Sequence, residues 1–191
     1  MTSSIDRYAH AWEFATLKHM GQTYGGRHTG QQIPYINHLA SVAAEVACGL
    51  AGEAGWDLDL AIQCALLHDV VEDTDTTIDE VRDQFGAAVA SGVLALSKDA
   101  AIGSRAEQME DSLRRIRLQA REIWAVKLAD RITNLYHPPF YWTAEKIAQY
   151  KVESNTILHA LGPASKALEA RLAKQIAAYG KPIGSGPAGS A

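Results

Sequence analysis

The sequence has few cysteines, no long apolar run and no excess of basic charge. Its two cysteines, Cys48 and Cys64, each lie inside an apolar helical pattern. A pair leaves a disulfide open, but we expect small buried thiols in a reducing cytoplasm. No stretch approaches the roughly 20 apolar residues that a membrane helix needs. The N-terminal residues show no basic start followed by an apolar segment, so we expect no secretion signal. These absences predict a cytoplasmic protein with no membrane partner.

The charge balance also excludes some classes of partner. A formal net charge of -4 argues against a nucleic-acid-binding protein, which usually carries a basic face or run. It does not exclude a nucleotide, because a few Lys and Arg side chains determine the potential at one site. A chain of 191 residues, 47% hydrophobic and 21% charged, suits one globular domain. We expect this domain over residues 1–180 and a disordered tail over 181–191, which has no apolar anchor.

The sequence has no convincing alternating strand pattern, and its dominant period is helical. Residues 21–35, rich in Gly, Gln and Thr, are expected to form a loop. Asp57 is placed to cap a very apolar helix whose last turn carries the residues from His68 to Asp73. Thr77 and Glu80 fit a capping box that opens a short helix ending at Phe85. The other helices are expected over residues 5–20, 36–50, 87–96, 104–119, 121–135, 143–161 and 164–179.

The most informative stretch runs from an apolar helix directly into a histidine and several carboxylates. On one helix Asp69, Glu72 and Asp73 would lie close along one surface, and the negative helix C-terminus would add to their repulsion. A divalent cation among them would reverse this balance. Taken alone, the stretch also fits a solvated acidic helix end, and His68 also fits a core histidine.

Two other segments supply further ligand types. His38 stands in the first turn of a helix, and Asp130 lies among apolar positions of another helix. A buried Asp needs a cation or several hydrogen-bond donors. Two imidazoles and two carboxylates from His38, His68, Asp69 and Asp130 suit an octahedral Mn, Fe, Co, Ni or Mg site with open positions. Closed zinc sites more often use Cys, and neither cysteine has ligand spacing.

These residues resemble the HD superfamily, named for a His-Asp doublet of the His68-Asp69 type. The closer similarity is to the hydrolase domain of RelA/SpoT proteins and to free-standing small alarmone hydrolases that include the metazoan SpoT homologue. The matching pieces are Ala15…His19-x-x-Gln22, Pro34-Tyr35-Ile36-Asn37-His38, Ala65-Leu66-Leu67-His68-Asp69-Val70-Val71-Glu72-Asp73-Thr74, Phe85-Gly86, Val126-Lys127-Leu128-Ala129-Asp130-Arg131-x-x-Asn134-Leu135 and Trp142-x-x-x-Lys146-x-x-x-Tyr150. Together they extend over nearly the whole globular part of the chain.

The resemblance implies an all-α fold of about eight to ten helices and a Mn²⁺-type ion. It also implies removal of the 3′-diphosphate from guanosine tetra- or pentaphosphate, the alarmones of the stringent response, with release of pyrophosphate. The implied metal ligands are His38, His68, Asp69 and Asp130. Glu72 and Asp73 would position and deprotonate the attacking water, whose pKa the metal lowers. Attack in line then depends on positioning and electrostatics.

The resemblance also suggests contacts with the substrate. Asn134 would face the nucleoside, Tyr150 would pack against base or ribose, and Lys146 and Lys98 would meet phosphate. Lys146 and Tyr150 equally fit an amphipathic helix, and Lys98 equally fits a surface lysine. The loop before Pro34 is longer than the family's usual basic loop, and its candidate basic contact is Arg27. The altered loop leaves guanine or adenine preference open.

Three functions therefore remain open from the sequence. The first is a pyrophosphohydrolase acting on ppGpp or ppApp. The second is a nucleotide phosphatase that removes, for example, the 2′-phosphate of NADPH. The third is a non-catalytic HD module that senses a nucleotide or mediates oligomerisation, against which the complete ligand set argues. Apolar positions such as Ile157, Leu161 and Leu168 could serve either the core or a homodimer.

Overall fold

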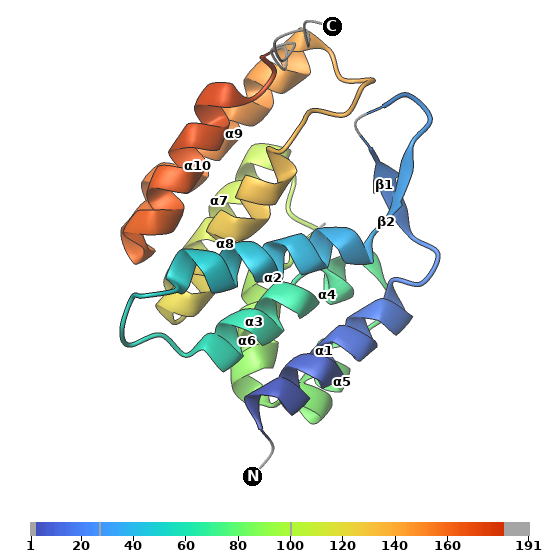
Figure 1. The fold of residues 1–191 in the computed structure, drawn as a ribbon, viewed down its shortest axis with the longest axis vertical. Helices are drawn as coiled ribbons and strands as arrows, with labels where there is room; N and C mark the ends of the chain where they lie inside the picture. The colour runs from blue at the N-terminus through green and yellow to red at the C-terminus, as the bar shows by residue number, and fades with distance from the viewer. Residues whose placement is uncertain (1–2, 27, 100, 182–191) are drawn as a thin grey trace, which may run out of the picture.

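The computed structural model describes residues 3–26, 28–99 and 101–181 (Figure 1). Nearly all of the elements are helices, which confirms the all-α fold expected for an HD domain. In chain order they are α1 (Ser4–Lys18), β1 (Thr23–Gly25), β2 (Gln32–Pro34), α2 (Ile36–Leu50), α3 (Leu58–Leu67), α4 (Val70–Asp73), α5 (Ile78–Phe85), α6 (Ala87–Leu96), α7 (Arg105–Arg117), α8 (Arg121–Asn134), α9 (Ala144–Leu161), a 3₁₀ helix (Gly162–Ala164) and α10 (Lys166–Ala178). All but one residue of the expected disordered tail, 181–191, lie outside the described residues.

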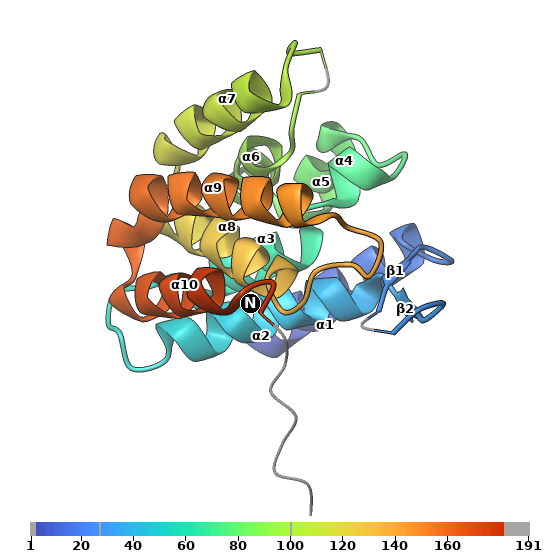
Figure 2. The same ribbon diagram turned by 90° about the horizontal axis from the view of Figure 1, so that it is seen from above.

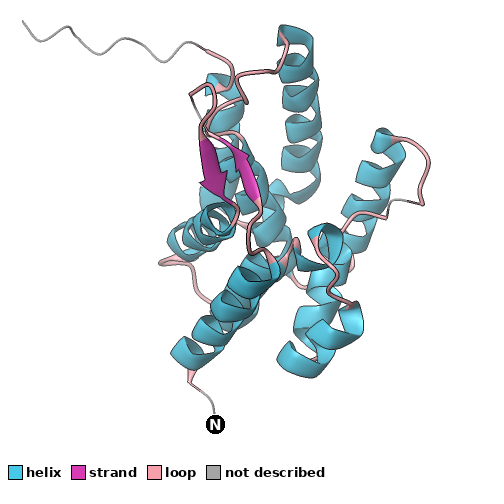
Figure 3. Cartoon of the chain, turned by 90° about the vertical axis from the view of Figure 1, so that its right-hand side faces the viewer, coloured by secondary structure: helices cyan, strands magenta, loops and turns pink. Residues whose placement is uncertain are grey.

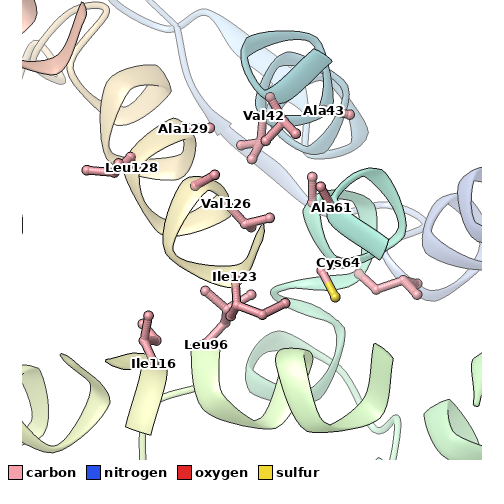
Figure 4. Packing of buried hydrophobic residues seen from close by; sticks show 14 of the residues in the cluster. Val42, Ala43, Ala61, Cys64, Leu96, Ile116, Ile123, Val126, Leu128 and Ala129 are labelled. Atoms are coloured by element: carbon pink, nitrogen blue, oxygen red, sulfur yellow. The ribbon is translucent and has the colours of Figure 1, made fainter. Parts of the chain in front are cut away.

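Helix α8 lies at the centre of the packing and contacts α2, α3, α7, α9 and α10. Its residues from Ala125 to Thr133 are all buried. Figure 4 shows Ile123 and Val126 of α8 facing Ala61 and Cys64 of α3 across the core. Helices α9 and α10 lie side by side on the other side of α8 (Figures 1 and 2). A polar residue between Ala125 and Thr133 is therefore held away from water.

The expected loop over residues 21–35 contains a short antiparallel hairpin instead (Figure 3). Strands β1 and β2 pair Tyr24 with Ile33 and Gly25 with Gln32. The Nδ2 of Asn37 donates to the hydroxyl oxygen of Tyr24 over 2.6 Å, which ties the hairpin to the start of α2. Strands of three residues are too short to show an alternating pattern, which explains why the sequence did not indicate them.

The expected helix through Asp73 is interrupted. Helix α3 ends at Leu67, and a separate turn of helix, α4, begins at Val70, with Asp69 as its N-cap residue. Glu72 and Asp73 therefore lie in the first turn of α4 rather than in the last turn of a long helix. Glu72 and Asp73 are the last two residues of this single turn, which is too short for a helix dipole to favour either sign of charge at them.

The caps explain most helix starts. Asp57 accepts from the N–H of Leu60, as expected, and Thr77 accepts from the N–H of Glu80. The expected return bond of a capping box at Thr77 is not formed among the described residues, because the Glu80 carboxylate pairs with Lys18 over 3.0 Å. Complete capping boxes begin α1, where Ser3 and Asp6 bond reciprocally, and α7, where Ser104 and Glu107 do so.

The structure corrects one expectation about apolar residues and decides another that the sequence left open. Cys64 is a free buried thiol, but Cys48 is free and exposed rather than buried. Ile157, Leu161 and Leu168 are buried within the chain, so they belong to the core and offer no dimer surface. Among the described residues, no helix is long and apolar enough to cross a membrane.

Candidate metal centre

Three side chains from three helical segments meet at one buried point. His38 comes from the first turn of α2, His68 follows the last residue of α3, and Asp130 projects from α8. One potential ligand atom from each lies within 4.8 Å of the others, and all three residues are buried. The Nε2 of His38 lies 3.5 Å from Oδ1 of Asp130, and the Nε2 of His68 lies 3.8 Å from it. The structure thus brings together three of the four expected ligands.

Asp69, the fourth expected ligand, adjoins both imidazoles of this group. Its Oδ2 is 3.0 Å from Nε2 of His68 and 3.8 Å from Nε2 of His38. The same oxygen accepts a hydrogen bond from the Tyr35 hydroxyl over 2.5 Å. Burial and the Asp69 charge raise the pKa of the Tyr35 phenol, so it stays protonated and donates. Tyr35, which sequence reasoning gave no role, therefore fixes the orientation of Asp69.

The hydrogen bonds of both imidazoles direct their Nε2 atoms toward the cluster. Nδ1 of His68 donates to the carbonyl oxygen of Ala65 over 2.8 Å. The Thr133 hydroxyl donates to the carbonyl of Asp130, so its oxygen is available to accept from Nδ1 of His38, 3.4 Å away. Such contacts behind a metal-binding histidine commonly fix its tautomer. Nε2 of His68 is buried and makes no well-aligned hydrogen bond among the described residues.

The electrostatics of the cluster also fit a cation. Burial raises the pKa of Asp130, but Lys127 and the two imidazoles outweigh it and hold that pKa well below its usual range. Burial lowers the pKa of His68, but Asp69 and Asp130 outweigh it and raise that pKa to about 10. In the absence of metal, the His68 ring is therefore protonated on both nitrogens at neutral pH. A divalent cation would meet two imidazole nitrogens and carboxylate oxygens, a donor set suited to Mn, Fe, Co or Ni.

The turn that carries Glu72 and Asp73 is held by the segment between α1 and β1. Nε2 of Gln22 donates to the carbonyl of Asp73 over 2.8 Å, and Oε1 of Gln22 accepts from Nδ1 of His19 over 2.7 Å. The His19 ring stacks on Tyr35 with centroids 5.0 Å apart. This geometry gives the His19-x-x-Gln22 motif a physical role. Burial, with Asp69 and Glu72 adding to it, raises the pKa of Asp73.

Two cavities adjoin the cluster and share Tyr35, His38, Arg105, Asn134 and Tyr150. The first, of about 330 Å³, is walled mainly by aromatic side chains. The second, of about 530 Å³, contains all the predicted reactive carboxylates and a matching set of cations. Its charged residues are Asp69, Glu72, Asp73, Asp130, Lys98, Arg105, Lys127 and Arg131. A ligand with a flat apolar group and a charged group would therefore place the two side by side next to the His38–His68–Asp130 cluster.

The structure places three of the five predicted substrate residues in these cavities. Asn134 and Tyr150 line both of them, and Lys98 lines the charged one. Nδ2 of Asn134 donates to Oδ1 of Asp130 over 2.5 Å. Lys146 is not among the lining residues: its Nζ lies 5.5 Å from the centroid of the Trp142 ring, and it lines a separate groove between α7 and α9. Arg27 lies outside the described residues.

Sequence reasoning missed three cations of the charged cavity. Arg105 lies in the first turn of α7 and forms two hydrogen bonds with the Glu153 carboxylate, of 3.1 and 3.0 Å. Arg131 is buried with its guanidinium carbon 4.1 Å from the centroid of the Tyr150 ring. Lys127 is buried, and its Nζ donates to Oδ2 of Asp130 over 2.9 Å. The spacing of Lys127, one turn before Asp130 in an apolar helix, was a usable signal, whereas nothing local marks Arg105.

The fold and this cluster define the class of the protein. The family model for the HD domain matches residues 11–166, and the chain belongs to that family. Among curated proteins, it is 33% identical over 165 residues to the guanosine-3′,5′-bis(diphosphate) 3′-pyrophosphohydrolase MESH1 of Danio rerio. That alignment covers 83% of this chain and 86% of the relative.

Two further comparisons agree with this membership. A guanosine-3′,5′-bis(diphosphate) 3′-pyrophosphohydrolase of Aquifex aeolicus is 39% identical over 127 residues, which cover 65% of this chain but only 17% of that longer protein. A solved structure titled as a metazoan orthologue of SpoT that hydrolyses ppGpp superposes with a TM-score of 0.76. Its sequence is 26% identical, and the match covers 93% of this chain and 97% of that one.

We expect metal binding to release protons. The pKa of His68 is raised to about 10 in the metal-free protein, so below that pH its ring is an imidazolium. A cation that binds Nε2 must displace the proton on that nitrogen. Affinity for Mn²⁺ should therefore rise as pH rises from 6 to 8, by about tenfold per unit for each proton released. Calorimetric titration in two buffers of different ionisation enthalpy measures the release. Binding with no released proton would contradict it.

We expect the two buried partners on α8 to be strongly coupled in stability. Asp130→Ala leaves the Lys127 ammonium buried without its partner, which should lower the free energy of unfolding by about 3–5 kcal/mol. Replacing both residues, as Lys127→Met with Asp130→Ala, removes the unpaired charge and should recover most of that loss. Urea unfolding of the metal-free proteins tests this. Equal losses of unfolding free energy in the single and double variants would show that Asp130 does not stabilise the fold through this ion pair.

Proposed function

We propose that this protein is a metal-dependent phosphohydrolase that removes the 3′-diphosphate from ppGpp-type alarmones and releases pyrophosphate. One observation carries the proposal: the buried His38–His68–Asp130 cluster adjoins both a charged and an aromatic cavity. The activity of its HD-domain relatives supports the same substrate class. Mn²⁺ or another octahedral divalent ion is the proposed cofactor, with His38, His68, Asp69 and Asp130 as its ligands.

The cation, when bound, lowers the pKa of a water molecule and neutralises charge that grows on the phosphate oxygens. In the proposed reaction a water oxygen bonds to the phosphorus that is attached to the 3′-oxygen. The bond between this phosphorus and the 3′-oxygen breaks. Asp73 accepts the proton of the water, a role that its raised pKa suits. Glu72 orients the water from the same turn of helix. The leaving 3′-oxygen takes up a proton from solvent, pyrophosphate departs, and Asp73 returns its proton to solvent.

The substrate lies across the two cavities in this proposal. Its phosphates face the cations Arg105, Arg131 and Lys127 in the charged cavity, where guanidinium groups suit phosphate geometry. Its base lies in the aromatic cavity, where the rings of Trp142 and Tyr150 pack edge to face with centroids 5.0 Å apart. Aromatic walls bind any base by stacking, so the class of substrate is better supported than the particular base.

The test is hydrolysis of ppGpp, ppApp and NADPH with and without Mn²⁺, with pyrophosphate resolved from orthophosphate. We expect metal-dependent pyrophosphate release from one or both alarmones, and their ratio gives the base preference. Orthophosphate from NADPH alone would instead make the protein a nucleotide phosphatase that uses the same site. No turnover of the three compounds by metal-loaded protein would overturn the proposed substrate class.

The two carboxylates of α4 should act in turnover rather than in metal binding. Asp73→Asn removes the proton acceptor, and we expect kcat to fall by about 10²–10⁴-fold. Glu72→Gln should also lose most turnover, while both variants keep the Mn²⁺ affinity of the unaltered protein. Steady-state kinetics combined with calorimetric Mn²⁺ titration separate the two effects. Full activity of Glu72→Gln would remove Glu72 from the mechanism.

A further inference from the structure

Lys98, which follows the end of α6, holds both carboxylate oxygens of Glu72. Its backbone N–H donates to Oε2 over 2.9 Å, and its Nζ donates to Oε1 over 2.7 Å. Two different groups of one residue therefore fix the carboxylate in two directions. A backbone donor adds precision that a flexible ammonium alone cannot give.

The segment that presents Lys98 is itself anchored. The Arg115 guanidinium of α7 donates to the carbonyl oxygens of Leu94, Ala95 and Ser97 over 2.5, 3.2 and 2.8 Å, respectively. These are carbonyls at the end of α6, which have no partner within the helix. The Arg115 side chain is in turn held by Asp111, 2.7 Å from its Nε. The position of the Lys98 N–H is thus set by α7 through the end of α6.

Glu72 needs such a restraint because of its surroundings. It lies on a helix of only four residues, beside Asp69 and Asp73, and its side chain is about one-quarter exposed. Repulsion among these carboxylates favours a Glu72 rotamer turned out to solvent. The two bonds from Lys98 oppose that repulsion and keep the carboxylate at the wall of the charged cavity.

We propose that Lys98 is a positioning residue that holds Glu72 in its reactive orientation, rather than a ligand of the substrate phosphates. The inference rests on the proposed function, since it assigns Lys98 to the same reaction. Lys98 acts before substrate arrives, as preorganisation of the carboxylate that orients water. Loss of its ammonium should therefore lower kcat and leave KM unchanged.

The experiment compares Lys98→Met, Lys98→Arg and the control Lys18→Met on the alarmone that the wild-type protein turns over. Because the backbone N–H remains in every variant, Lys98→Met should lower kcat by about 10–100-fold, the effect of one lost charged hydrogen bond, with KM within twofold. Lys98→Arg keeps a cation and should recover part of kcat. Lys18 pairs with Glu80 and, over 4.0 Å, with Asp75, and it lines neither cavity, so its replacement should leave both constants unchanged. A KM that rises with the number of substrate phosphates, at constant kcat, would make Lys98 a phosphate ligand and overturn the proposal.

A second measurement keeps the test independent of turnover. In urea unfolding of the metal-free protein, Lys98→Met should lower the midpoint in the wild-type background and change it much less in the Glu72→Gln background, where the pair is already broken. If the wild-type protein hydrolyses no nucleotide, the proposed function fails. The unfolding comparison then still decides whether Lys98 and Glu72 interact. Additive losses in the double variant would show no coupling between Lys98 and Glu72 and would overturn the positioning role.

Discussion

The charge of Asp130, buried in the central helix of the domain, is the constraint on which the rest of the site depends. An ionised carboxylate in such a place needs partners on every side, and four groups meet it here. Lys127 and Asn134 contact it from its own helix, and the two imidazoles approach from α2 and α3. The packing of α2 and α3 on α8 therefore forms the core and assembles the metal ligands in one step.

Much of this arrangement followed from the sequence, because the residues that carry it lie in strongly periodic helices. The bounds of α2 and α6 agree with the expected 36–50 and 87–96, and the helices that carry His38 and Asp130 were located correctly. A polar residue among apolar helical positions is a strong local signal, since burial demands a partner. The signal identifies the buried residues but not the partners that other helices bring to them.

The features that the sequence missed depend on contacts between distant segments. The break between α3 and α4 is invisible in an apolar run followed by acids, because both helical turns share one period. Lys146 lies near the Trp142 ring but lines the groove between α7 and α9 instead of either cavity, and its spacing alone could not distinguish these faces. Arg105 reaches the charged cavity from a helix start that the sequence marks only with its capping box. Each of these features depends on how helices pack against one another, and the sequence pattern of a single helix does not show that.

The interruption at Asp69 also bears on the motions of the domain. A helical segment of four residues cannot hold its own hydrogen bonds in water, so α4 is ordered only by what surrounds it. Those restraints come from the hairpin side through Gln22, from the end of α6 through Lys98, and from Asp69 at its own start. Amide hydrogens of α4 should therefore exchange with solvent faster than those of α3 or α8. A cation bound at the His38–His68–Asp130 cluster, beside Asp69, would oppose that local opening, so that Glu72 and Asp73 become more rigid when the site is loaded.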